Sequence, residues 1–137
     1  MPQKILIADD EESIRATIRR VFAGYVVVSA CDGADAVRVI AAERPSVVLL
    51  DLHMPVMGGL EVLSVFKGAE YSPPFIVLTG DEEMEMAARA LEMGAASYIT
   101  KPFDVDFIKR IVLAALGGPK AGEKNTDRPW SVKRNKD

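Results

Sequence analysis

Five polar side chains stand directly behind, or shortly after, short apolar runs in the sequence. They are Asp9, Asp10, Asp51, Thr79 and Lys101. Carboxylates that are crowded together repel one another, and the pKa of at least one of them rises unless a cation is present. Mg²⁺ is a hard cation that binds carboxylates, carbonyl oxygens and water, and then the phosphate of a substrate. If the fold gathers these side chains, they predict an acidic Mg²⁺ site flanked by a hydroxyl and an ammonium group.

The apolar runs themselves predict β-strands. They are Ile5–Ala8, Val26–Ala30, Val47–Leu50, Phe75–Leu78 and Ser97–Ile99. Short runs that are rich in Val and Ile and bounded by turn or charged residues are typical of strands buried on both faces of a parallel sheet. Segments with helical spacing lie between them. Strict alternation of strands and helices predicts right-handed crossovers and a doubly wound parallel sheet, so we expect a single α/β domain with a flavodoxin-like (βα)5 fold and strand order 2-1-3-4-5.

The helical segments differ in how clearly they show a packing face. In the last helical segment, Asp104 is the expected N-cap and the helix is expected to end before Gly117. This segment carries one apolar stripe, made of Phe107, Ile108, Ile111, Val112 and Ala115. The fourth carries Met84, Ala87, Ala88 and Leu91 before Gly94, and we interpret these four as its packing face. The second runs from about residue 34 to 43 and must stop before Pro45, because proline disfavours the helical conformation of its predecessor.

The predicted strand order decides where the polar side chains meet. The carboxyl ends of parallel strands share one edge of the sheet, and ligands bind there, at the point where the strand order reverses. Because the first and third strands are neighbours at that point, Asp9, Asp10 and Asp51 are expected to converge in one acidic cleft. Thr79 and Lys101, from the fourth and fifth strands, would flank it.

Composition sets the wider limits. The 137 residues, 49% hydrophobic and 27% charged, suit one globular domain. The single cysteine, Cys31, excludes an internal disulfide, and its place behind a buried strand predicts a structural thiol. The longest apolar run, Ile111–Leu116, is too short to span a membrane, and the first residues show no signal-peptide pattern, so we expect a cytoplasmic protein without membrane contact.

Charge divides the chain into two parts. Residues 1–116 carry a net charge of −6 and residues 117–137 a net charge of +3. The acidic body is a poor candidate for direct nucleic-acid binding. The last residues contain too few apolar side chains to offset the entropy of ordering them. We therefore predict a folded domain over residues 1–117 and a flexible polar tail or linker over residues 118–137.

The constellation of polar residues resembles the receiver domain of two-component response regulators. The resemblance covers about Lys4–Leu116 and rests on the acidic pair, Asp51 and the residues around it (Val47–Pro55), Gly59, Thr79, Tyr98 and Lys101-Pro102. It implies that Asp51 is the phosphoacceptor, which takes a phosphoryl group from a phosphohistidine of a sensor histidine kinase or a histidine phosphotransfer protein. Asp9 or Asp10, Asp51 and the backbone carbonyl of His53 would hold Mg²⁺, and Lys101 would pair with the phosphate.

The resemblance also implies how the signal leaves the site. Thr79 would bond a phosphoryl oxygen, and Tyr98 would respond to its movement as the second half of a switch. The surface formed by the fourth helix, the fifth strand and the fifth helix would then control a protein partner, an output domain or a second copy. The Lys101-Pro102 bond is expected to be cis.

Each of these residues also has a purely structural interpretation. An isolated Asp behind a strand is usually a turn or cap residue, and a single Thr or Lys is usually structural or solvated. His53, the only histidine, is expected to be an exposed loop side chain near the site. Two alternatives to the phosphoacceptor remain: a receiver-like interaction module without phosphorylation, and a phosphatase with an aspartyl nucleophile. The phosphatase usually needs a second acid two residues beyond the nucleophile, where this chain has His53. The protein is therefore expected to be a signalling domain rather than an enzyme.

Overall fold

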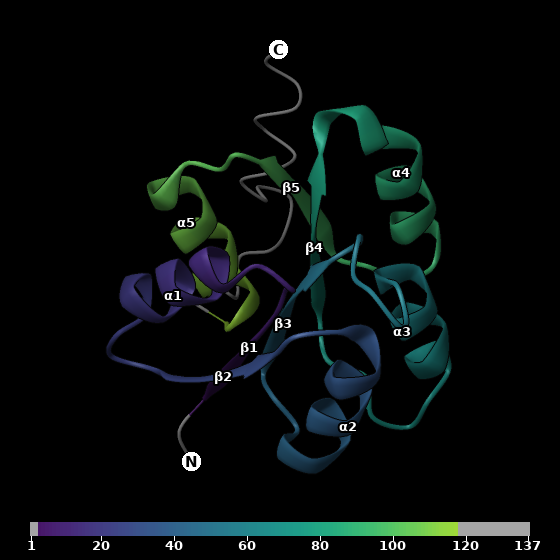
Figure 1. Ribbon diagram of the computed structural model, residues 1–137. Coiled ribbons are helices and arrows are strands. Elements are labelled where there is room, and N and C mark those ends of the chain that lie inside the picture. Colours follow the sequence, from purple (N-terminus) through teal and green to yellow (C-terminus); the bar gives the residue numbers. More distant parts are fainter. Residues whose placement is uncertain (1–2, 118–137) are drawn as a thin grey trace.

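The five apolar runs form one parallel sheet in the computed structural model, which describes residues 3–117 (Figure 1). The strands are β1 (Lys4–Ala8), β2 (Val26–Ala30), β3 (Val47–Asp51), β4 (Phe75–Gly80) and β5 (Ser97–Lys101). Their order is β2-β1-β3-β4-β5, and every pair of neighbours is parallel. The flavodoxin-like order predicted from the sequence is confirmed.

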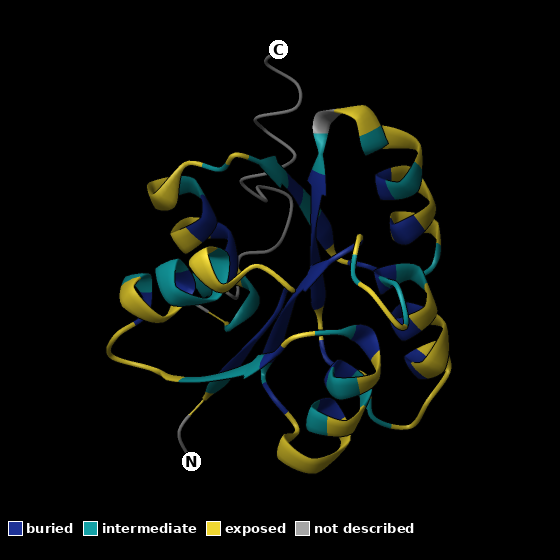
Figure 2. Cartoon of the chain, in the orientation of Figure 1, coloured by how far each residue is buried: buried dark blue, intermediate teal, exposed yellow. Residues whose placement is uncertain are grey.

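Helices cover both faces of this sheet. They are α1 (Glu12–Val21), α2 (Gly33–Glu43), α3 (Gly59–Phe66), the short 3₁₀ helix η1 (Asp81–Glu83), α4 (Met84–Glu92) and α5 (Val105–Ala115). On one face, Ile18 of α1 and Ile111 of α5 pack against alternate strand residues such as Ile7. On the other face, helices α2, α3 and α4 pack against the intervening strand residues. The sheet is therefore buried on both sides while the outer faces of the helices stay in solvent (Figure 2).

Helix α2 ends where the sequence requires. Its last residue is Glu43, and Arg44 adopts a left-handed conformation with φ 48°, while its N–H still bonds to the carbonyl of Ile40. Pro45 follows and cannot continue the helix. At the other end, the side chain of Asp32 accepts a hydrogen bond of 2.8 Å from the backbone N–H of Asp35.

The packing face predicted for α4 is confirmed only at Ala87 and is wrong at Met84, Ala88 and Leu91, which are exposed. Met84 and Leu91 are 39% and 38% exposed, and the buried residues of the helix are Ala87 and Ala90, with Met86 packed beside them. The helix is rich in Ala and Met on several sides, so apolar spacing alone fits more than one face. The small side chains let α4 approach the sheet closely, and the larger Met84 and Leu91 are left outside.

The structural role predicted for Cys31 is also wrong, because this side chain is exposed. Strand β2 ends one residue earlier, at Ala30, and the chain turns there toward α2. The backbone N–H of Cys31 donates a 3.3 Å hydrogen bond to the Asp35 carboxylate.

No helix in residues 3–117 combines the length and the apolar character needed to cross a membrane. The tail predicted over residues 118–137 lies outside the described residues.

Candidate functional site

The carboxyl ends of β1, β3, β4 and β5 bring the predicted site residues to one edge of the sheet. Asp9 follows β1, Asp51 is the last residue of β3, and Lys101 is the last residue of β5. Thr79 lies within β4, which extends one residue further, to Gly80. In the register of β4 and β5, Gly80 is paired with Lys101. At this edge β3, β4 and β5 extend beyond their predicted apolar runs, so backbone pairing in the sheet fixes the positions of Asp51, Thr79 and Lys101.

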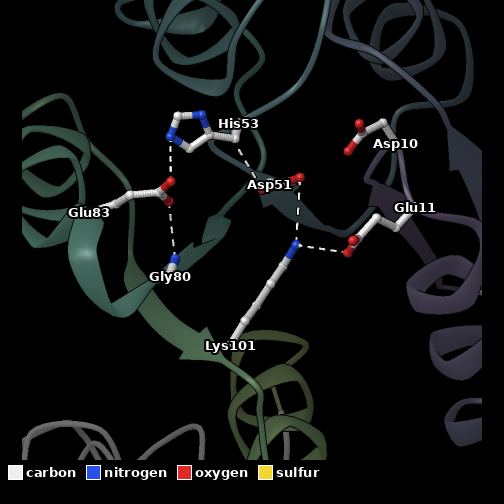
Figure 3. Close-up of a pocket in the computed structure, with 7 residues that line it drawn as sticks. All are labelled: Asp10, Glu11, Asp51, His53, Gly80, Glu83 and Lys101. Carbon is white, nitrogen blue, oxygen red and sulfur yellow. Dashed lines mark hydrogen bonds and ion pairs between the residues drawn. The ribbon is translucent and has the colours of Figure 1, made fainter.

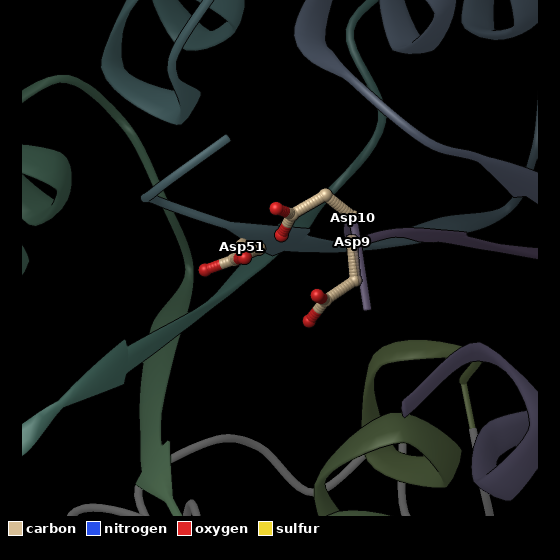
Figure 4. Close-up of side chains that lie close together, drawn as sticks. All are labelled: Asp9, Asp10 and Asp51. Atoms are coloured by element: carbon tan, nitrogen blue, oxygen red, sulfur yellow. The ribbon is translucent and has the colours of Figure 1, made fainter. Parts of the chain in front are cut away.

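Three carboxylates form a cluster at the switch point between β1 and β3 (Figure 4). One oxygen from each of Asp9, Asp10 and Asp51 lies within 4.8 Å of the others. Asp9 is fully buried, Asp51 is 4% exposed, and Asp10 is exposed. A group of carboxylate oxygens with one open side is the donor set that a hard divalent cation prefers, so the residues present fit such an ion.

Backbone hydrogen bonds orient the two buried carboxylates. The N–H of Glu11 donates to Oδ1 of Asp9 over 3.0 Å, and the N–H of His53 donates to Oδ1 of Asp51 over 3.1 Å. The guanidinium of Arg15 donates to the backbone carbonyl of Asp9 over 2.7 Å. Each carboxylate is therefore held through one oxygen, and its second oxygen faces the cluster and Lys101.

Lys101 supplies the positive charge of the site. Its Nζ lies 3.0 Å from Oδ2 of Asp9, 3.6 Å from Oδ2 of Asp51 and 3.7 Å from Oε1 of Glu11. Burial lowers the pKa of Lys101, but the hydrogen bond to Asp9 and the neighbouring carboxylates outweigh it, so the pKa is raised and the ammonium stays protonated. The following Lys101-Pro102 bond is cis, as expected.

The site opposes the ionisation of Asp51. Burial and the charge of Asp9 raise its pKa from 3.8 to about 7, although Lys101 and the His53 N–H act in the opposite direction. A positive charge in the cluster would restore the ionised carboxylate. The Asp51 carboxylate thus has the properties of a nucleophile that becomes active when a cation is bound.

A cleft of about 260 Å³ opens above this cluster (Figure 3). Its lining residues are Asp10, Glu11, Asp51, His53, Gly80, Glu83 and Lys101. The predicted exposure of His53 is confirmed, since its side chain is 59% exposed, and its Nε2 pairs with Oε2 of Glu83. Thr79 is buried and does not line the cleft; its hydroxyl lies 3.4 Å from Oε1 of Glu83.

Sequence reasoning missed two acidic residues of this cleft. Glu11 continues the acidic pair Asp9-Asp10, and its side chain is the third carboxylate near Lys101. Glu83 stands three residues after Gly80, and its Oε1 accepts a 3.1 Å hydrogen bond from the Gly80 N–H. The sequence contained a signal for Glu83, because a Glu three positions after an N-cap residue is typical of a capping interaction.

Tyr98 lies on the same side of the sheet as Thr79. Tyr98 is paired with Val77 in the register of β4 and β5, and Thr79 with Thr100, so both side chains point toward α4. Tyr98 is half-buried and packs against the core cluster that contains Ala90 of α4. The two predicted switch residues are thus arranged along one layer between the site and α4.

Comparison with known proteins decides the family. Residues 5–113 match the family model described as the response regulator receiver domain. The chain belongs to this family. Receiver domains are parts of two-component response regulators.

Individual relatives of this receiver domain differ in length. The sporulation initiation phosphotransferase F of Bacillus subtilis is 38% identical over 114 residues, which cover 82% of this chain and 92% of that protein. The regulatory protein AtoC of Escherichia coli is 39% identical over 82% of this chain, but the match covers only 25% of AtoC. Similarity therefore extends to nearly the whole of one relative and to a quarter of the other.

Solved structures show the same fold. The receiver domain of NtrX from Brucella abortus superposes with a TM-score of 0.77 at 28% identity, covering 84% of this chain and 99% of that one. The receiver domain of AraT from Geobacillus stearothermophilus superposes with a TM-score of 0.77 at 27% identity, with both chains fully covered.

Proposed function

We propose that this receiver domain accepts a phosphoryl group on Asp51 and is a phosphoprotein that carries 4-aspartylphosphate in its activated state. The observation that carries the proposal is the position of the Asp51 carboxylate: it is held by the His53 N–H, it lines the cleft, and Lys101 lies 3.6 Å away. A buried, oriented carboxylate beside a fixed positive charge is suited to attack phosphorus.

The phosphoryl donor in this proposal is a phosphohistidine of a sensor histidine kinase or histidine phosphotransfer protein. One oxygen of Asp51 forms a bond to phosphorus while the bond from phosphorus to the donor's imidazole nitrogen breaks, and the electron pair returns to that nitrogen. Lys101 neutralises phosphoryl oxygens as a compact point charge. Transfer of this kind needs mainly alignment and charge neutralisation, which the site is built to give.

Mg²⁺ is the cofactor in this proposal. Asp9, Asp10 and Asp51, together with the backbone carbonyl of His53, would hold it, since three of their oxygens lie within 4.8 Å of one another. When bound, Mg²⁺ supplies the positive charge that ionises Asp51 and neutralises the phosphoryl oxygens.

The domain boundaries and the output belong to the same proposal. Residues 1–117 form the receiver domain, and it acts in the cytoplasm as a signalling domain rather than as an enzyme. Thr79 and Tyr98 transmit phosphorylation to the surface of α4, β5 and α5, where a protein partner, an output domain or a second copy binds. The half-buried position of Tyr98 between β5 and α4 supports this route.

The decisive experiment is incubation with acetyl phosphate and Mg²⁺, followed by intact-mass measurement and assay of released phosphate. A phosphoryl adduct in the wild type that is absent in Asp51→Asn is the expected result. Asp106→Asn, which removes an exposed carboxylate from α5, is the matched control and should be labelled normally. Rapid phosphate release without an adduct would favour the phosphatase, and neither adduct nor release would favour the inert interaction module.

The proposed switch has its own test. Amide NMR spectra with and without beryllofluoride, an analogue of the phosphoryl group, should show large shifts at Thr79, Tyr98 and α4. Shifts confined to the neighbourhood of Asp9 and Asp51 would refute the route through Tyr98.

A further inference from the structure

The Glu83 carboxylate contacts Gly80 and His53 at the rim of the cleft (Figure 3), and it also lies close to the hydroxyl of Thr79. Its Oε1 accepts the 3.1 Å hydrogen bond from the Gly80 N–H. The Thr79 hydroxyl lies 3.4 Å from this Oε1 and also 3.4 Å from the backbone carbonyls of Gly80 and Glu83. Its Oε2 pairs with Nε2 of His53, which belongs to the segment after β3. One side chain of η1 therefore ties the end of β4 to the segment that follows Asp51.

Charge sets Glu83 apart from the other carboxylates that line the described cleft. Asp10 and Asp51 belong to the cluster that a cation would neutralise, and Glu11 lies 3.7 Å from Lys101. Among residues 3–117, the only basic side chain within 4.0 Å of Glu83 is His53. The Glu83 side chain is only 22% exposed, so water screens its negative charge incompletely.

A phosphoryl group on Asp51 would lie in the cleft that the Glu83 carboxylate also lines. The phosphoryl group carries nearly two negative charges, and it accepts hydrogen bonds from the same kinds of donor as the Glu83 carboxylate does. The hydroxyl of Thr79 can donate only one hydrogen bond at a time. A donation to the phosphoryl group is therefore lost to the present acceptors of this hydroxyl, which are the carboxylate and carbonyl of Glu83 and the carbonyl of Gly80.

We propose that Glu83 is a positioning residue that holds Thr79 and Gly80 in the unphosphorylated arrangement and competes with the phosphoryl group for them. The inference rests on the proposed function of Asp51 and names a residue that regulates the same site. Phosphorylation must displace Glu83 from Thr79, and the loss of the contact with His53 releases η1 and the start of α4. The carboxylate thus sets how readily the domain adopts its activated form.

The alternative is that Glu83 only caps the helical turn at the end of β4. Two variants separate these roles. Glu83→Gln keeps the oxygen that accepts from the Gly80 N–H but removes the negative charge, whereas Glu83→Ala removes both. A cap alone predicts that Glu83→Gln behaves like the wild type and that Glu83→Ala merely loses stability.

The test is an amide NMR titration of the full chain with beryllofluoride and Mg²⁺. For Glu83→Gln we expect beryllofluoride to bind roughly three- to tenfold more tightly than to the wild type, since a competing charged acceptor is gone. Glu83→Ala should shift the affinity in the same direction. Glu85→Gln removes the same charge from an exposed position of α4 and should leave the affinity unchanged. Equal affinities for wild type and Glu83→Gln would overturn the proposal.

Two further readouts test the connection with His53 and Thr79. Without beryllofluoride, the amide shifts of Thr79 and Gly80 in Glu83→Ala should move part of the way toward their positions in the activated wild type. His53→Gln removes the partner of Glu83 Oε2, so it should change the affinity for beryllofluoride in the wild-type background but not in Glu83→Gln. If His53→Gln has the same effect in both backgrounds, His53 acts on beryllofluoride directly and the link through Glu83 is wrong.

Failure of this inference is distinguishable from failure of the proposed function. If beryllofluoride does not bind the wild type, or binds Asp51→Asn equally well, the phosphoacceptor assignment itself is refuted. If binding requires Asp51 but ignores Glu83, only the competition is refuted.

Discussion

Replacement of Asp51 by asparagine should stabilise the metal-free protein, and the gain should depend on pH. The side chain has nearly the same shape, but it removes one charge from the cluster in which three carboxylate oxygens lie within 4.8 Å. Burial and the charge of Asp9 raise the pKa of Asp51 from 3.8 to about 7. The folded protein therefore keeps a proton on Asp51 that the unfolded chain has already lost.

The sign and size of the effect follow from this difference. As pH rises from about 4 to about 7, unfolding releases the proton from Asp51, so the wild type loses stability across this window, by at most about 1.4 kcal/mol per pH unit. Well below pH 3.8 the carboxyl group is neutral in both states, like the amide of asparagine. Between about pH 5 and about pH 8 the advantage of Asp51→Asn should grow by about 2–3 kcal/mol.

Urea unfolding in EDTA, followed by far-ultraviolet circular dichroism, measures this directly. The difference between Asp51→Asn and wild type is compared at the two pH values, so that titrations common to both proteins cancel. Glu70→Gln removes an exposed carboxylate outside the cluster and should show no such growth. An advantage of Asp51→Asn that is the same at both pH values, or that is absent at the higher one, would refute the electrostatic argument.

Three other outcomes are expected. Mg²⁺ at about ten times its Kd should raise the free energy of unfolding of the wild type by about 1.4 kcal/mol, and an unchanged thermal midpoint at millimolar Mg²⁺ would contradict the proposed site. Gly59→Ala should lose about 1–3 kcal/mol in urea unfolding, because its Cβ would lie 2.7 Å from the Asp51 carbonyl oxygen, whereas Gly24→Ala, with nothing within 4 Å, should stay near the wild type. Tyr71→Phe should cost about 1 kcal/mol in the same assay, since it removes the 2.6 Å hydrogen bond to the carbonyl of Pro45; equal stability would show that this bond contributes nothing net.

The sheet was predictable from the sequence because each strand is a short apolar run between turns, and the site because its residues follow those runs. Asp51 and Lys101 needed only the strand order to be placed side by side. The packing face of α4 was not predictable in this way. Met84 and Leu91 are larger and more apolar than Ala87 and Ala90, yet the smaller side chains face the sheet, because the space between α4 and the sheet decides which residues fit.

The role of Glu83 depends on contacts that no local pattern specifies. A capping signal around Gly80 and Glu83 is visible in the sequence, but the pairing with His53 joins residues 30 positions apart. This pairing forms only if the segments that follow β3 and β4 lie close enough for the two side chains to touch. Likewise, the end of β2 at Ala30 was predicted correctly, but the exposure of Cys31 depends on how the chain turns there toward α2.

The contact between Asp9 and Lys101 joins side chains that are 92 residues apart in the chain. A ribosome delivers the acidic end of this pair first and the ammonium group only after four of the five strands have been made. Until β5 joins β4, the carboxylates have no built-in counter-charge, and the N-terminal part of the domain can place Asp51 in a sheet but cannot assemble the cleft. Completion of the acidic cleft is therefore coupled to completion of synthesis. Under the proposed function, a chain interrupted before Lys101 would lack the ammonium group that neutralises the phosphoryl oxygens.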